Sequence, residues 1–140
     1  MAQIKPSGIF YDLMSLGSVP EPSSIGARLA KEGTTMARAT FTHGNGIAAV
    51  CAAIKYATGE IIDGSDPALS LSKSSRFTEI KGLSNEDLSK LPEGAVVVWG
   101  KTDLMSISIG NGKQAGDNIS TQVTSYHGPN NKNFRVFMPK

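Results

Sequence analysis

The sequence predicts an α+β fold in which N-terminal helices pack on an antiparallel β-sheet. One segment, residues 47–59, places apolar side chains at helical spacing, and four later segments have the apolar or alternating pattern of strands. The helical patterns come first and the strands then follow one another, which is typical of a helix layer on an antiparallel meander. The expected strands are residues 95–99, 106–110, 119–126 and 134–138.

The first expected helix is short and spans residues 24–33. Ser23 or Ser24 offers a side chain suited to an N-cap, and Gly33 is a residue type at which helices commonly end. Residues 34–46 mix β-like and turn-forming types, so they predict no single element.

The second expected helix has the clearest pattern in the chain. Ile47, Val50, Cys51 and Ile54 follow the i, i+3, i+4, i+7 spacing of one helix face, and Gly59 fits a C-terminal cap. The intervening alanines would let this helix pack closely against a sheet.

The segment between this helix and the strands predicts mostly irregular structure. Residues 60–77 have the composition of a loop, and residues 77–82 fit a short strand. Ser84 and Asp87, three residues apart, resemble a capping box, so one or two helical turns are expected before Pro92.

The expected strand at 106–110 alternates between serine and isoleucine side chains. Alternation buries one face of the strand and leaves Ser106 and Ser108 on the other. The Gly-Asn-Gly sequence at 110–112 then predicts a tight hairpin turn.

Length and composition indicate one domain with an extended arm. The 140 residues suffice for a single core, which we assign to residues 23–140. Residues 1–22 are rich in Gly, Pro and Ser and carry a short apolar patch at 9–14, typical of an arm that docks on the domain or on a partner.

Charge and hydropathy exclude several classes of function. The formal net charge is only +2 and the basic residues are scattered, so no nucleic-acid partner is expected. No segment approaches the roughly 18 apolar residues of a membrane span. The N-terminus lacks the basic start and apolar core of a signal peptide, so we expect synthesis in the cytoplasm. Association with a virion, or export by a non-Sec route, would then bring the protein to a cell wall.

Three stretches together resemble a known family. They read LPEGAVVVWGKT at 91–102, ISIGNGKQAGDN at 107–118 and FRVFMPK at 134–140, after a helix rich in small residues. Residues 45–138 are thereby similar to the CHAP and NlpC-type peptidoglycan amidohydrolases, which are small papain-like cysteine peptidases. Family members often carry Pro-Gly-Asp-Val-Val-Val-Trp-Gly and then Gly-His-Ile-Ser-Ile-Gly. The resemblance implies a papain-like α+β domain.

The resemblance also implies a catalytic pair that this sequence lacks. The family places a cysteine at the start of the helix and a histidine at the start of the second core strand. These two positions fall on Ile47 and Ser106, and neither side chain can serve as thiolate or general base. Asp117 matches an aspartate of the family, although Gly116 precedes it where the family has serine.

Substitute catalytic residues are few. Cys51 lies one helical turn beyond Ile47 and could pair with His43, but a cysteine among alanines inside a helix is more often a small core residue. His127 fits an ordinary loop histidine. Trp99 fits a packing residue, with a second interpretation as the edge of a substrate-binding cleft. The single cysteine and two histidines form no metal-binding pattern, and no cofactor is predicted.

The sequence therefore favours a degenerate amidohydrolase-like domain that serves in binding or assembly. Its expected partners are peptidoglycan or other subunits of a bacteriophage virion, a tail or a secretion particle. One alternative is an active peptidoglycan amidase or endopeptidase with an atypical Cys–His site. The other is an inhibitor or immunity protein that shares the hydrolase shape.

Overall fold

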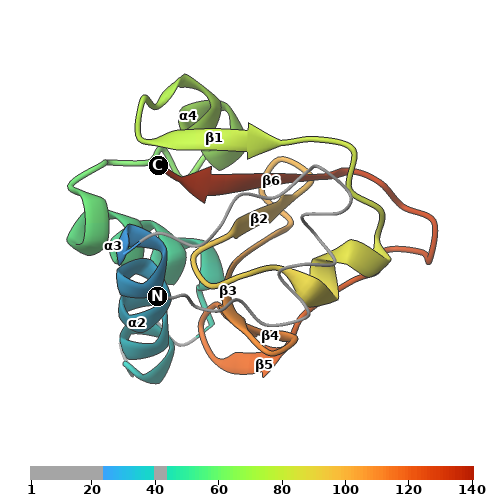
Figure 1. The fold of residues 1–140 in the computed structure, drawn as a ribbon, viewed down its shortest axis with the longest axis horizontal. Coiled ribbons are helices and arrows are strands. Elements are labelled where there is room, and N and C mark those ends of the chain that lie inside the picture. The colour runs from blue at the N-terminus through green and yellow to red at the C-terminus, as the bar shows by residue number, and fades with distance from the viewer. Residues whose placement is uncertain (1–23, 40–43) are drawn as a thin grey trace, which may run out of the picture.

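The protein has the α+β fold that its sequence predicts. A computed structural model describes residues 24–39 and 44–140, so the predicted arm at 1–22 lies outside the described residues. Within them lie a six-stranded antiparallel sheet and three α-helices (Figure 1). The helices are α2 (Ser24–Arg38), α3 (Gly46–Thr58) and α4 (Pro67–Lys73).

The sheet has the strand order β1-β6-β2-β3-β4-β5. The last strand of the chain, β6, is thus inserted between the first two, and it pairs antiparallel with both. Figure 1 shows β6 in red between β1 and β2. The strands are β1 (Phe77–Ile80), β2 (Val96–Trp99), β3 (Leu104–Gly110), β4 (Lys113–Ala115), β5 (Ile119–Thr121) and β6 (Phe134–Pro139).

The two faces of the sheet have separate hydrophobic cores. The helices cover one face, where Val50, Ile54 and Leu71 pack against Val96 and Val98. We call this the helix face. The opposite face is covered by the 3-10 helix η2 (Glu86–Lys90) and by the segment around Val123 and Tyr126. Burial on both sides explains why β2 is a continuous run of apolar residues.

The strongest helix prediction is confirmed and the weaker one is wrong at its end. Asn45 caps α3, since its side-chain oxygen accepts a hydrogen bond from the Ala48 amide at 3.1 Å, and Gly59 ends it with a left-handed φ of 81°. By contrast, α2 runs through Gly33 to Arg38. A Cβ at Gly33 would lie 3.1 Å from Cδ1 of Ile107, so this glycine permits close packing on β3 rather than ending the helix.

The prediction of a loop at 60–77 is wrong in its middle, where α4 forms. Asp66 caps this helix by accepting a hydrogen bond from the Leu69 amide at 3.4 Å, and Pro67 occupies its first turn. Both are ordinary helix-start residues, so the local sequence already contained the indication.

The strands differ from their predicted bounds by two residues or more at three ends. β1 ends at Ile80 instead of continuing to 82. β3 starts at Leu104, and β5 ends at Thr121 instead of continuing to 126. The Gln122 amide still donates to the carbonyl of Gly112 at 2.8 Å, but the Val123 amide donates to the side-chain Oε1 of Gln114 at 3.1 Å instead of to a backbone partner. β4 was predicted only as the far side of a hairpin.

The two predicted turns are confirmed. The capping box forms as expected: the Ser84 amide donates to Oδ2 of Asp87 at 2.8 Å, and the Asp87 amide donates to Oγ of Ser84 at 3.3 Å. The helical turn that follows is of the 3-10 type. Residues 110–112 form the β3–β4 hairpin with φ values of 83°, 56° and 73°, which Gly and Asn adopt at little cost.

Candidate functional site

The start of α3 is the place where the resembled family carries its nucleophile. Asn45 and Gly46 bring the helix start close to β3, since a Cβ at Gly46 would lie 3.9 Å from the carbonyl oxygen of Met105. Ile47 is half-buried and packs against the core of the helix face. The side chain at this helix start is therefore an aliphatic packing residue.

Ser106 lies on the face of the sheet opposite to α3. It pairs with Val97, which belongs to the core away from the helices, whereas its neighbour Met105 pairs with Val98 on the helix face. Side chains of directly paired residues share a face, so Ser106 and Ile47 do not face each other. Met105 is the residue of this strand end that faces the helices. The hydroxyl of Ser106 is fully buried and has no hydrogen-bond partner within the described residues.

Asp117 helps to hold the loop before α3. Its Oδ2 accepts a hydrogen bond from the backbone amide of Gly44 at 2.8 Å. This contact joins the β4–β5 turn to the start of the helix across 73 positions of sequence. The carboxylate of Asp117 is thus used to hold a backbone amide of this loop.

Cys51 lies one turn further along α3 and is half-buried. Burial, and secondarily the negative charge of Asp63, raises the pKa of its thiol from an ordinary 9.0 to about 11. At pH 7 a thiol with a pKa of about 11 is ionised in roughly one molecule in ten thousand. The environment of Cys51 thus opposes the thiolate that a cysteine nucleophile needs.

The predicted partners of Cys51 do not complete a site within the described residues. His43 lies outside them. His127 is exposed in the loop after β5, where its ring packs on Tyr126 with centroids 4.3 Å apart. Tyr126 in turn packs on the core away from the helices, so His127 and Cys51 belong to opposite sides of the sheet.

Trp99 is a core residue of the face away from the helices. Its side chain is 1% exposed and contacts the rings of Tyr126 and Phe134 at centroid distances of 5.9 and 5.0 Å. The packing interpretation is confirmed, and the indole offers no edge to a ligand in a cleft.

A groove lies elsewhere, where β1 and β6 separate. It has a volume of about 210 Å³ and is lined by residues from the end of β1, the loop after it and the start of β6. Its lining includes three basic residues, Lys81, Lys132 and Arg135, and one acidic residue, Glu79. We call it the β1–β6 groove. Its remaining lining residues are Ile80, Gly82, Leu83, Phe134 and Val136.

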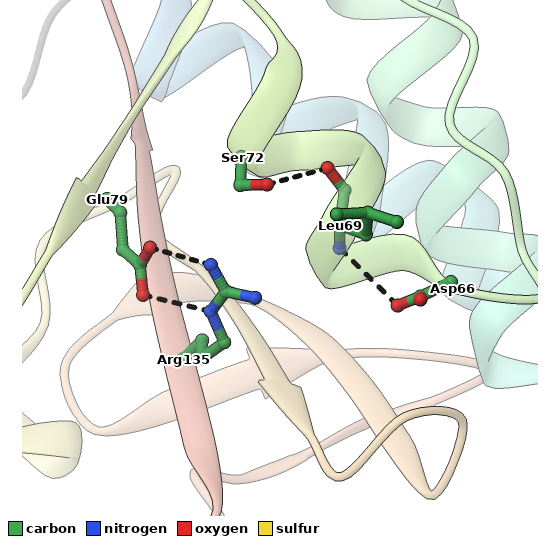
Figure 2. A network of polar contacts seen from close by, with 5 residues as sticks. All are labelled: Asp66, Leu69, Ser72, Glu79 and Arg135. Carbon is green, nitrogen blue, oxygen red and sulfur yellow. Dashed lines mark hydrogen bonds and ion pairs between the residues drawn. The ribbon is translucent and has the colours of Figure 1, made fainter.

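A bidentate ion pair forms one wall of the β1–β6 groove. Figure 2 shows the guanidinium of Arg135 directed at the carboxylate of Glu79, with Nη2 to Oε1 at 2.8 Å and Nε to Oε2 at 3.0 Å. The hydrogen bonds from Arg135 lower the pKa of the Glu79 carboxyl. This acidic charge is already paired, so the groove has an excess of positive charge from Lys81 and Lys132.

Comparison with known proteins identifies no relative: no family model, curated protein or solved structure matches the chain. In the described part of the chain, no three His, Cys, Asp or Glu side chains gather closely enough to hold a metal ion. Among the described helices, none is both long enough and apolar enough to cross a bilayer.

The β1–β6 groove was not predicted from sequence. Residues 77–82 and 134–138 were each expected to be strands, but nothing in the local pattern pairs two segments more than 50 positions apart. The one available indication was charge, since Glu79 and Arg135 lie in otherwise largely apolar strands and opposite charges on neighbouring strands interact favourably.

Proposed function

We propose that this chain is a CHAP/NlpC-like domain without a catalytic pair, and that it acts in binding or assembly. The observation that carries the proposal is the chemistry where α3 begins over β3. Ile47 and Met105 lie there on the helix face, and neither has a group that ionises near neutral pH. Cys51, the single cysteine of the chain, keeps its proton up to a pH of about 11.

The arrangement of elements is compatible with the papain-like fold that we propose. A helix rich in small residues packs over an antiparallel sheet, and its N-terminus lies against the strand that the resemblance aligns with the histidine strand. In an active enzyme of that design, the helix N-terminus would stabilise a thiolate. Here the side chain of Asn45 accepts a hydrogen bond from the Ala48 amide in the first turn, and Asp117 holds the preceding loop, so these polar groups have a structural role.

Peptidoglycan or other subunits of a bacteriophage or secretion particle are the partners we propose. A domain that keeps the outline of a wall hydrolase can hold wall material or a particle subunit without cleaving it. The Gly-, Pro- and Ser-rich composition of residues 1–22 suits an arm that connects subunits. The basic lining of the β1–β6 groove gives the domain itself a surface for binding.

The test is incubation of the full chain with purified peptidoglycan sacculi. We expect the protein to sediment with the sacculi, and mass spectrometry to find no released peptides. The Cys51→Ala variant is the matched control and should behave like the parent in both measurements. Released peptides that disappear with Cys51→Ala, or with His43→Ala, would establish an atypical active site and overturn the proposal.

A further inference from the structure

The β1–β6 groove exists because β1 ends before β6 does. The two strands pair from Phe77↔Pro139 to Ile80↔Val136, whereas β6 begins two residues earlier, at Phe134. Continuing the register would put Gly82 opposite Phe134. Gly82 instead adopts a left-handed φ of 83° and turns the chain away, which opens a gap beside the start of β6.

Phe134 is half-buried and lines the groove that this gap forms. Two hydrogen bonds fix the direction of the groups along β6: the Lys140 amide donates to Arg76 on the β1 side at 2.8 Å, and the Gly100 amide donates to Asn133 on the β2 side at 2.9 Å. Backbone groups of alternate residues point to opposite neighbours. Phe134 therefore directs both its N–H and its C=O toward the groove.

These two groups are left without a strand partner. β1 has already ended, and among the described residues no loop hydrogen bond reaches the N–H or C=O of Phe134. A donor and an acceptor on one residue, side by side in an open groove, match the C=O and N–H of one residue of an extended peptide. Binding of this kind extends a sheet by one strand.

The walls indicate which side chains such a peptide would carry. Lys81 and Lys132 are exposed, and neither forms an ion pair among the described residues, whereas Arg135 is bound on two of its nitrogens by Glu79. Glu79 also feels the positive charge of Lys81, but its carboxylate oxygens are both held by Arg135. Asp66 adds a negative charge near Arg135, but it lies outside the lining. The two lysines thus remain to attract carboxylates. Ile80 and Leu83 supply a small apolar floor.

We propose that the β1–β6 groove binds an extended peptide segment with acidic side chains, which pairs with Phe134 at the exposed edge of β6. A volume of about 210 Å³ is smaller than a drug-sized pocket and suits one or two peptide residues, with the flanking residues outside over the lysines. The peptide belongs to a protein partner. The inference names a partner chemistry for the proposed binding role, but it does not depend on the loss of catalysis.

The test uses the full chain and an octapeptide of alternating Glu and Val that carries fluorescein on its N-terminus and an amide at its C-terminus. We expect saturable binding by fluorescence anisotropy in low salt, weakening as salt rises, and at least tenfold weaker binding of the Gln–Val peptide. Lys81→Glu and Lys132→Glu should each weaken binding roughly five-fold or more. Lys113→Glu, the same charge change on β4 at the other end of the sheet, should leave binding unchanged.

Two further readouts address the backbone pairing. The Phe134 ring lies 5.0 Å from Trp99, the single tryptophan of the chain, so bound peptide should alter the tryptophan emission. The amide resonance of Phe134 should shift in a ¹⁵N spectrum. A Glu–Val peptide methylated on the backbone nitrogens of alternate residues, with the blocked N–H groups facing the groove, should lose binding although its charge is unchanged.

Several results would overturn the inference. They are no binding of the Glu–Val peptide at millimolar concentration, equal weakening by Lys113→Glu, or full binding of the methylated peptide. A shift of the Phe134 amide resonance with peptidoglycan fragments, but not with the acidic peptide, would also overturn the inference, in favour of a wall ligand. Sacculus hydrolysis would instead overturn the proposed lack of catalysis and leave this binding result standing. Thermal unfolding of each lysine variant checks that it is folded.

Discussion

The reactivity of Cys51 gives the most direct test of whether helix α3 carries a catalytic cysteine. The thiol is half-buried, and desolvation together with the charge of Asp63 raises its pKa from 9.0 to about 11. Since the thiolate is the nucleophile, Cys51 should react slowly with a disulfide reagent such as DTNB at pH 8. A cysteine retained for catalysis would do the opposite.

The size of the effect follows from two opposing terms. A pKa higher by about two units lowers the thiolate fraction about 100-fold at pH 8. A more basic thiolate attacks faster, with a Brønsted coefficient of about 0.4–0.5, which restores roughly six- to ten-fold. We therefore expect a rate about ten-fold or more below that of an unperturbed thiol, and burial of the sulfur lowers it further.

The measurement is the pseudo-first-order rate of thiol modification across pH 7 to 11, with Cys51→Ser as the blank. The rate should rise with pH over this whole range, and unfolding in denaturant should restore the rate of a free thiol. Asp63→Asn removes the nearby negative charge, so it should lower the pKa of the thiol and raise the rate. A native rate that reaches its plateau below pH 8 would refute the reasoning, because it would mean that the fold stabilises the thiolate.

Two further predictions concern what holds the sheet together. Gly94→Ala should lower the free energy of unfolding by about 3 kcal/mol or more in urea titrations, because φ is 93° and a new Cβ would lie 2.4 Å from Cα of Gly26. Gly59→Ala, also left-handed at φ 81° but with open space around it, should cost only about 1–2 kcal/mol, and equal losses would count against the packing explanation. Glu79→Gln should cost about 0.5–1 kcal/mol at pH 7. Arg135 lowers the pKa of Glu79 below its ordinary 4.5, so this contribution is present above that pH and is lost as pH falls through the lowered pKa. Urea titrations from pH 7 to 3 should show parent and variant converging, and a constant difference would show that the ion pair is not its source.

Local pattern was sufficient where one segment determined its own structure. The helix at Gly46–Thr58 and the turn at Ser84–Asp87 were predicted because their caps and apolar spacing lie within a few residues of one another. The helix α4 was missed although Asp66 and Pro67 had the same kind of indication. The many serines of residues 60–77 give this segment the composition of a loop, which obscures the helix start.

Elements that depend on contacts with distant residues were predicted less well. Gly33 was expected to end its helix, yet α2 continues because Ile107 of β3 packs against the space that a Cβ would fill. β5 was predicted too long, because at Val123 the side chain of Gln114 replaces the backbone partner. Neither contact can be found from the sequence of one segment alone.

At the candidate sites, the sequence by itself determined some features and the tertiary structure decided the others. Alternation in β3 already put Met105 and Ser106 on opposite faces, but it could not say which face the helices cover. The packing of α3 decided that, and so decided that Ser106 faces away from Ile47. The β1–β6 groove arises in the same way, from the pairing of two distant strands and the turn at Gly82. The period of a segment is set by its own side chains, whereas its neighbours and their register are set by the packing of the whole chain.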